Sequence, residues 1–262
     1  MANMTSSVSA SQVAGELASA TFEEIPALVE HYREDPRQQV IKACERALKR
    51  HDKELADRER VNDMYELMHE LGGDGVVVGV DEVGRGSVAG PLTVCAVCLP
   101  MEPRVWGIND SKKLTPARRE LLSVKIAEVA TAIGFCHIAP KDIDEMGMAR
   151  AIRTAVAGAV ADTGLEPDCV LMDGNPLGAV PNERDVVKGD AKIACIAAAS
   201  IMAKVTRDEM MVEYDAEYPE YHLAESKGYA SPEHIEAIRK HGLCPLHRVS
   251  FCGNFLQTER LF

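Results

Sequence analysis

A run of valines that stops at two carboxylates, Val76–Val80 followed by Asp81 and Glu82, constrains this chain more than any other feature. Such a β-branched run is typical of a buried strand. Two neighbouring anions at its end repel each other, and they are tolerated where a cation or a bound proton compensates them. The Gly-Arg-Gly segment at 84–86 then offers backbone N–H groups and a guanidinium, which suit an anion. The segment therefore predicts a cation site beside a phosphate site at the end of a strand.

The composition suits one large soluble domain with a smaller appendage, because 46% of the 262 residues are hydrophobic and 27% are charged. A formal net charge of −12 does not by itself point to a nucleic-acid partner, although an acidic total can hide a local basic patch. The chain shows neither a signal peptide nor an apolar stretch that could span a membrane. We therefore expect a cytoplasmic protein without a membrane partner, and we expect a monomer.

Glycines at 72, 73 and 75 separate a helical N-terminal part from a region in which strands and helices alternate. Before them, the Ser- and Ala-rich residues 1–20 are expected to form a mobile arm, and residues 22–71 to be largely helical. Beyond them, strands are expected at 76–80, 91–99, 132–138, 169–172 and 185–187, and helices at 115–130, 141–161 and 191–213. This order predicts an α/β protein with an N-terminal arm and helical extension at 1–72, an α/β domain at 73–214, and a C-terminal cap of helix and loop at 215–262.

Two further carboxylates, Asp173 and Asp190, also follow predicted strands, and Asp190 opens a predicted helix. Strand ends can converge at one edge of a sheet, and Asp81 and Glu82 can join such a site if the backbone turns away at Gly84. An all-oxygen site favours Mg²⁺ or Mn²⁺ over zinc, and two such ions about 3.5–4 Å apart suit in-line displacement at phosphorus. Each acid also has an ordinary explanation: a turn for Asp173, a helix cap for Asp190, and a solvated strand end for the pair.

The order of the motifs resembles that of ribonuclease HII, the type 2 ribonuclease H that acts on RNA in RNA–DNA hybrids. The resemblance begins at Gly79-Val80-Asp81-Glu82-Val83-Gly84-Arg85-Gly86 and covers roughly residues 60–252. Several separate motifs in the family's order make it specific. The other similar segments are residues 89–91, 109–114, 172–175, 187–190, 198–201, 203–208, 227–229 and 247–248.

The resemblance implies a ribonuclease H-like fold, with a central mixed β-sheet flanked by helices and a C-terminal helical segment. It implies an endonuclease that hydrolyses RNA in hybrids and cuts 5′ of single ribonucleotides embedded in duplex DNA, as in ribonucleotide excision repair. The products would carry 5′-phosphate and 3′-hydroxyl ends. Asp81, Glu82, Asp173 and Asp190 would hold two Mg²⁺ or Mn²⁺ ions for in-line attack by water.

The resemblance also assigns residues to the substrate. The backbone of Gly84, Arg85 and Gly86 would read the 2′-hydroxyl, which distinguishes RNA from DNA, because glycine allows a close approach. Tyr229 would reach the same hydroxyl and stack on the following deoxyribose, which marks an RNA-to-DNA junction. The remaining candidates for phosphate contacts or for ordering the site are Ser111, Lys112, Lys188 and Lys204.

Three alternatives stay open. One is ribonuclease HIII-like specificity, with poor action on single ribonucleotides, although that type usually has threonine where Arg85 stands. Another is an inactive nucleic-acid-binding scaffold, against which the intact acids argue. The third is a nucleotide-binding enzyme, but the chain has neither Gly-x-x-x-x-Gly-Lys-Ser/Thr nor Gly-x-Gly-x-x-Gly.

The last six residues, Gln257 to Phe262, resemble short peptides that bind sliding clamps. Such motifs are weak, and a docked or disordered tail is the commoner explanation. A sliding clamp is therefore a minor expectation among the partners, beside RNA–DNA hybrids and ribonucleotide-containing duplex DNA.

Overall fold

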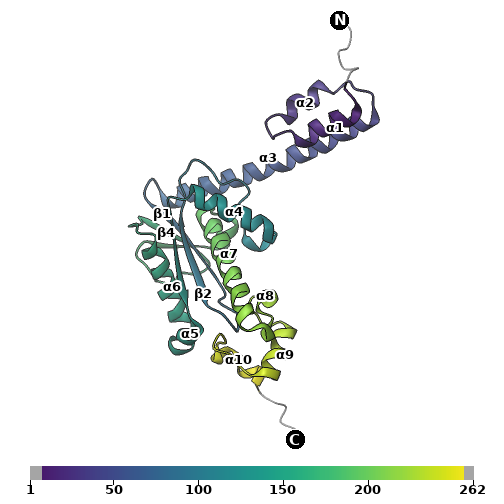
Figure 1. Ribbon diagram of the computed structural model, residues 1–262. Helices are drawn as coiled ribbons and strands as arrows, with labels where there is room; N and C mark the ends of the chain where they lie inside the picture. Colours follow the sequence, from purple (N-terminus) through teal and green to yellow (C-terminus); the bar gives the residue numbers. More distant parts are fainter. Residues whose placement is uncertain (1–7, 257–262) are drawn as a thin grey trace. The chain divides into compact units, whose positions relative to one another are not determined.

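The computed structural model describes residues 8–256, which divide into two compact units at the boundary between Asn62 and Asp63 (Figure 1). The first unit contains α1 (Ala10–Ser19), α2 (Ile25–His31) and the beginning of the long α3 (Gln38–Gly72). These helices enclose a small apolar core of their own. Its buried members are Val13, Leu17, Ile25, Tyr32, Val40 and Ala47.

Helix α1 corrects the expectation of a mobile arm for residues 10–19, whereas residues 1–7 of the expected arm lie outside the described residues. Ser9 caps the helix by accepting from the Gln12 N–H, and the Gln12 side chain accepts from the Ser9 N–H in return. Such a capping box stabilises the first turn, and burial of Val13 and Leu17 fixes the helix in the unit. The expectation was wrong because it rested on the Ser- and Ala-rich composition and not on the capping residues of this helix.

The second unit is built on a five-stranded sheet with the order β3-β2-β1-β4-β5. Strand β1 pairs antiparallel with β2 and parallel with β4; β2 and β3 are antiparallel, and β4 and β5 are parallel. The sheet is therefore mixed, and the predicted α/β class is confirmed. The strands are β1 (Val77–Val83), β2 (Leu92–Cys98), β3 (Ala132–Ile138), β4 (Cys169–Asp173) and β5 (Glu183–Val186).

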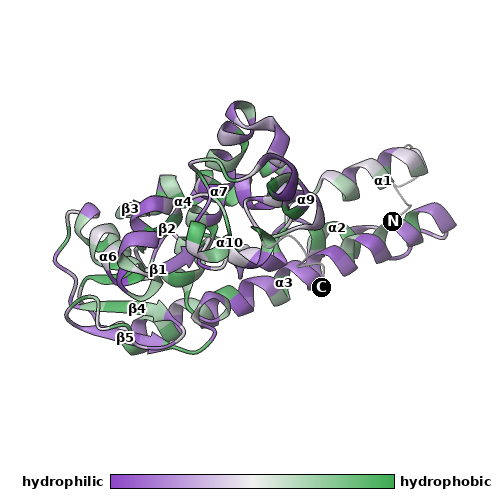
Figure 2. Ribbon diagram, turned by 90° about the horizontal axis from the view of Figure 1, so that it is seen from below, coloured by the Kyte–Doolittle hydropathy of each residue, from purple (hydrophilic) through white to green (hydrophobic). Residues whose placement is uncertain are grey.

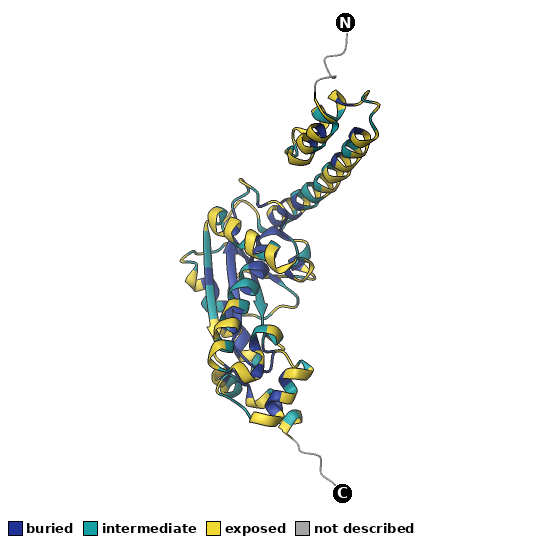
Figure 3. Ribbon diagram, turned by 45° about the vertical axis from the view of Figure 1, so that its right-hand side comes forward, coloured by how far each residue is buried: buried dark blue, intermediate teal, exposed yellow. Residues whose placement is uncertain are grey.

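Helices cover both faces of this sheet, with α7 (Ala194–Glu217) on one face and α6 (Met148–Asp162) on the other (Figure 1). The alanine-rich start of α7 allows close packing on β1. A side chain at Gly79 would come within 2.3 Å of the Cys195 backbone, so only glycine fits there. The central strands β1, β2 and β4 and the start of α7 form the buried centre of the unit (Figure 3). No helix within residues 8–256 is both long and apolar enough to cross a membrane.

Shorter helices complete the second unit. Helix α4 (Pro116–Val129) packs beside α7, and the 3₁₀ turn η2 (Ser111–Lys113) precedes it. The C-terminal segment packs its apolar residues on Val88 and Ala89, in the loop after β1. Its elements are η4 (Pro219–Tyr221), α8 (Leu223–Ser226), α9 (Pro232–His241) and α10 (Val249–Leu256).

Several boundaries differ from the sequence expectations, and three of the differences are described here. Strand β1 continues through both acids to Val83, because β2 extends alongside as its antiparallel partner. The single helix expected over 141–161 is divided into α5 (Pro140–Met146) and α6 by Gly147, whose φ of +77° ends the first helix. Asp190 does not open α7. It lies in a separate 3₁₀ turn, η3 (Gly189–Ala191), and Ile193 precedes the helix.

Candidate active site

Asp81 and Glu82 lie within strand β1 and point to opposite faces of the sheet. Successive strand side chains alternate, so Asp81 shares the α7 face with Gly79, whereas Glu82 shares the α6 face with the core residues Val78 and Val80. The sequence suggested that the two acids could share a site if the backbone turns away at Gly84. Strand β1, which was expected to end at Val80, instead continues through both acids to Val83, with Asp81 paired to Cys95 and Glu82 to Val94.

The pKa of Asp81 is raised from 3.8 to about 7. Burial is the main cause, and the negative charges of Glu82 and Asp173 add to it. Hydrogen bonds from the Ser200 hydroxyl and from the Glu82 N–H act in the opposite direction. Ser200 was not among the predicted site residues. Its hydroxyl lies 2.9 Å from that of Ser111, and both serines are buried, so Ser111 acts inside the protein rather than on its surface.

Asp173 ends β4, the parallel neighbour of β1, and so reaches the same sheet edge as Asp81. Its carboxylate accepts from the Gly189 N–H at 2.7 Å, which fixes the turn that carries Asp190. Burial raises the pKa of Asp190, and the charges of Asp173 and Asp110 raise it further. Lys112 opposes this effect from 3.9 Å, at the exposed side of Asp190. The carboxylate of Asp110 was missed by the sequence analysis.

The four predicted acids therefore interact through their charges, although within residues 8–256 no three His, Cys, Asp or Glu side chains already stand in a metal-binding arrangement. Burial is the main cause of the raised pKa of Glu82, and Asp173 raises it further. Oxygen-only donors suit Mg²⁺ or Mn²⁺, and a divalent cation at this edge would offset the repulsion that raises the pKa of Asp81. The donor set thus fits such ions.

The two glycines of the Gly-Arg-Gly loop differ in what the fold requires of them. Gly84 has a φ of +84°, and a side chain there would lie 2.3 Å from Nε of Arg207. Gly86 has no such constraint: a Cβ atom at this position would meet nothing within 4 Å. The fold accounts for Gly84, whereas Gly86 leaves open space in front of the backbone. Arg85 is exposed, and its guanidinium lies 3.5 Å from the Glu82 carboxylate.

Two buried arginines, Arg207 and Arg248, hydrogen-bond residues 85–91, the Gly-Arg-Gly loop and the segment that follows it. Arg207 donates to the carbonyl oxygens of Pro91, Ala89 and Lys227 and to the Ser87 hydroxyl, at 2.8–3.1 Å. Arg248 donates to the Gly90 carbonyl at 2.9 and 3.1 Å and to the Arg85 carbonyl at 3.2 Å. Both belong to segments that resemble the family, 203–208 and 247–248, but neither was predicted to have a role. The pKa of Arg248 is lowered to about 10, mainly by burial and in addition by the charge of Arg207.

Tyr229 is 40% exposed, and its ring centre lies 5.7 Å from Cζ of Arg207. A buried histidine pair fixes its backbone. His234 Nδ1 donates to the Tyr229 carbonyl at 2.9 Å, so in its neutral form His234 Nε2 accepts from His247 Nε2 at 3.1 Å. His247 Nδ1 then accepts from the Cys244 N–H at 3.0 Å. Both rings are neutral in this arrangement, and every ring nitrogen has a partner.

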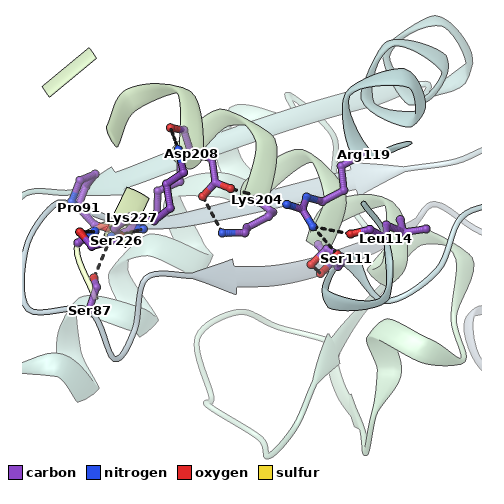
Figure 4. Close-up of polar contacts among 12 residues, drawn as sticks. Ser87, Pro91, Ser111, Leu114, Arg119, Lys204, Asp208, Ser226 and Lys227 are labelled. Carbon is purple, nitrogen blue, oxygen red and sulfur yellow. Dashed lines mark hydrogen bonds and ion pairs between the residues drawn. The ribbon is translucent and has the colours of Figure 1, made fainter. Parts of the chain in front are cut away.

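The predicted lysines lie in different surroundings. Lys112 is beside Asp190, and exposed Lys188, with a left-handed φ of +58°, precedes the same acid by two residues. Lys204 instead forms an ion pair with Asp208 at 2.6 Å, and Arg119 lies 4.0 Å from the same carboxylate (Figure 4). These three residues line an open groove of about 580 Å³ between α4 and α7. The structure thus separates Lys204 from the contacts that join the acids.

Comparison with known proteins identifies the family. The ribonuclease HII profile matches residues 78–254, which contain all four acids and the Gly-Arg-Gly loop. The chain belongs to the ribonuclease HII family. It is therefore an enzyme, a nuclease of the ribonuclease H type. A separate profile, the ribonuclease HII N-terminal domain, matches residues 9–71.

Relatives and solved structures agree with the ribonuclease HII assignment. A ribonuclease HII of Ruminiclostridium cellulolyticum is 43% identical over 211 residues, which are 79% of this chain and 82% of that relative. The crystal structure of ribonuclease H2 from Pyrococcus horikoshii has a TM-score of 0.59 at 27% identity, covering 70% of this chain and 99% of the other. Ribonuclease HII of Archaeoglobus fulgidus, solved in complex with PCNA, has a TM-score of 0.58 at 25% identity, covering 66% of this chain and 94% of the other.

Proposed function

We propose that this ribonuclease HII hydrolyses RNA in RNA–DNA hybrids and cuts 5′ of single ribonucleotides embedded in duplex DNA, leaving 5′-phosphate and 3′-hydroxyl ends. The observation that carries the proposal is the open space in front of Gly86, four residues beyond the acids of β1. A backbone without a side chain can approach a 2′-hydroxyl closely. The residue that selects the substrate then lies close in the chain to the acids of the metal site.

Asp81, Glu82, Asp173 and Asp190 are the residues that would hold Mg²⁺ or Mn²⁺ ions, because they supply oxygen donors at one edge of the sheet. When bound, a pair of such ions supplies an activated water and stabilises the leaving oxygen of an in-line displacement. The solved ribonuclease HIII in complex with Mn²⁺ has a TM-score of 0.54 at 18% identity and supports the fold alone.

The other residues of the site position the nucleic acid. The backbone of Gly84, Arg85 and Gly86 reads the 2′-hydroxyl, and the exposed Arg85 guanidinium contacts a neighbouring phosphate. Tyr229 stacks on the deoxyribose that follows a ribonucleotide, with its backbone fixed by His234. Exposed Lys112, beside Asp190, and exposed Lys188, two residues before it, meet phosphates near the metal site.

The decisive experiment uses a labelled DNA duplex with one embedded ribonucleotide, incubated with Mg²⁺ or Mn²⁺, and maps the cut. Cleavage on the 5′ side of the ribonucleotide is expected. Cleavage of long RNA–DNA hybrids without cleavage of this duplex would favour ribonuclease HIII-like specificity instead. Loss of both activities would support a binding scaffold. The clamp-binding peptide expected at 257–262 lies outside the described residues and stays a prediction, as do the cytoplasmic location and the monomeric state.

A further inference from the structure

Four exposed cations of the first unit lie on one face of α3. Lys42, Arg46, Lys49 and Lys53 follow one another at spacings of four, three and four residues, and all four are exposed. With 3.6 residues per turn, this spacing places them within about 60° of one another around the helix axis, over a length of about 16 Å. We call these four residues the basic row.

The basic row is distinguished by its lack of partners. Within residues 8–256, none of its four side chains forms an ion pair. The other five Lys or Arg side chains within the described part of this unit all have partners, so the unpaired Lys and Arg side chains there are confined to one face. Those five are Arg33 with Glu30, Arg37 with Asp35, Arg58 with Glu23 and Glu54, Arg60 with Asp57, and Arg50 with the carbonyl oxygens of Leu17, Ala18 and Ala20.

Two other rows of α3 repeat every seven residues beside the basic row. One row is acidic, and the other is apolar, with each residue 38–41% exposed. Apart from the apolar row, most of the surface of α3 is hydrophilic (Figure 2). From the helical period, the acidic row lies between the apolar row and the basic row. The acidic row is Glu45, Asp52 and Glu59, and the apolar row is Ile41, Leu48 and Leu55.

This separation selects among polyanionic partners. A helix that lies on an acidic membrane places its cations beside its apolar face, so that both meet the surface together. In α3 the carboxylates of the acidic row lie between the cations and the apolar row. A membrane that contacted both rows would also have to contact these carboxylates, which an acidic surface repels. A phosphate backbone needs only the cations. A duplex carries one negative charge per about 1.7 Å of its axis, so about 16 Å of it presents enough phosphates for four contacts.

We propose that the basic row of α3 binds the sugar–phosphate backbone of the substrate duplex, so that the N-terminal unit is a substrate-holding part of the enzyme. The proposal rests on the proposed function, because that function makes a nucleic-acid duplex the partner. A chain with a net charge of −12 repels a polyanion as a whole, and a row of unpaired cations gives a local attraction. The contact is independent of sequence, as backbone contacts are.

The test measures binding of a fluorescent RNA–DNA hybrid to the full chain in metal-free buffer, over a series of salt concentrations. One variant carries Lys42→Gln, Arg46→Gln, Lys49→Gln and Lys53→Gln together. Each phosphate contact contributes about −0.9 to the slope of log affinity against log salt, so removing four should reduce the slope by roughly 3–4. Affinity near 100 mM salt should fall at least tenfold. Wild-type affinity and slope in this variant would overturn the proposal.

Two further variants isolate the row from charge and folding effects. Lys42→Arg, Lys49→Arg and Lys53→Arg keep the charges and should bind like the wild type. Adding Glu34→Gln, Glu45→Gln, Asp52→Asn and Glu59→Gln to the fourfold variant restores the net charge of −12, and all four acids are exposed. Binding should stay weak in this variant. Recovery of the affinity to the wild-type value would show that only the total charge matters, and it would refute binding by the basic row.

Cleavage kinetics separate this proposal from the proposed function. The fourfold variant should raise KM for the hybrid and leave kcat unchanged, because the row is not part of the catalytic machinery. A wild-type chain that cuts no hybrid with Mg²⁺ or Mn²⁺ would defeat the proposed function, while the binding series would still report on the row. If the wild-type chain cuts the hybrid but the four substitutions leave binding unchanged, only the proposal for the basic row is refuted.

Discussion

The hydroxyl of Ser200 lies 2.9 Å from that of Ser111, 89 residues earlier in the chain, and both side chains are buried. Ser200 also hydrogen-bonds the Asp81 carboxyl. The two serines thereby connect η2, helix α7 and strand β1 at the site. The orientation of Asp81 therefore depends on elements that are distant in sequence.

Ser200→Ala should impair cleavage without unfolding the protein. Loss of the hydroxyl removes a contact that lowers the pKa of Asp81, so the acidic limb of the pH–activity profile should move to higher pH. A hydrogen bond to a charged group contributes about 1.5–3 kcal/mol, so kcat/KM near neutral pH should fall roughly 10- to 100-fold. Ser123→Ala is the matched control, because its hydroxyl bonds only the Glu120 carbonyl within α4. An unmoved acidic limb would contradict the role of Ser200.

Substitution of the two loop glycines by alanine should affect different properties, stability at Gly84 and cleavage at Gly86. Gly84→Ala should lower the free energy of unfolding by about 2–3 kcal/mol, because the positive φ and the contact with Arg207 both disfavour a side chain. Gly86→Ala should cost less than about 1 kcal/mol, yet reduce cleavage of an RNA–DNA hybrid at least tenfold. Urea unfolding and initial rates measure the two effects. A Gly86→Ala enzyme with normal rates would remove Gly86 from the substrate contact.

The buried histidine pair should make the fold sensitive to acid. The pKa of His247 is lowered from 6.5 to about 4, mainly by burial and in addition by the positive charge that His234 would carry. A lowered pKa in the folded state means that the neutral ring stabilises the fold above pH 6.5, and this contribution is lost as pH falls from about 6.5 to about 4. The loss should reach about 3 kcal/mol at most.

His247→Gln tests this pH dependence, because the amide can still donate to His234 Nε2 but does not titrate in this range. The free energy of unfolding of both proteins is measured by urea denaturation between pH 4 and pH 7. The variant should have a flatter profile than the wild type. Parallel profiles over the whole interval would show that the pair does not titrate as described.

Asp81→Asn should abolish cleavage and spare substrate binding. The substitution removes one negative charge from the candidate metal site and roughly keeps the shape of the side chain. Since burial raises the pKa of Asp81 from 3.8 to about 7, the stability of the wild type falls as pH rises from about 3.8 to about 7, and at pH 8 the variant should be at least as stable as the wild type. Cleavage assays, hybrid binding and thermal unfolding at pH 8 measure the three effects. Near-normal turnover would refute the assignment of Asp81.

Tyr229→Phe should reduce cleavage at RNA–DNA junctions more than cleavage of long hybrids. The ring and its approach to Arg207 are kept, so the fold should be unaffected, and only the phenolic hydroxyl is lost. Initial rates on one embedded ribonucleotide are compared with those on a continuous hybrid. Equal losses on the two substrates would count against a junction-sensing role.

Local patterns in the sequence were enough to predict the sheet but not the supports of the site. Valine-rich runs and alternation located the strands, and the acids at their ends indicated the edge of the sheet. The end of β1 was misplaced because pairing with β2 extends the strand through Asp81 and Glu82, and no local signal records that partner. The split at Gly147 depends on a positive φ, which glycine permits but does not require.

The contacts behind the Gly-Arg-Gly loop could not be predicted for a related reason. Arg207 lies in a helix that reads as ordinary, and its partners Ser87 and Pro91 precede it by 120 and 116 residues. Ser200 looks like one small residue in an alanine-rich helix until the fold brings it to Asp81. Such roles arise from tertiary proximity, for which one sequence carries no periodic signal.

The support of the Gly-Arg-Gly loop by Arg248 has a consequence for synthesis of the chain. Arg248 donates to the carbonyl of Arg85, 163 residues earlier, and Ala89 pairs with His247. A growing chain folds in order from its N-terminus, so the sheet can form while residues 244–248 are still inside the ribosome. The loop gains its final supports only when that segment emerges.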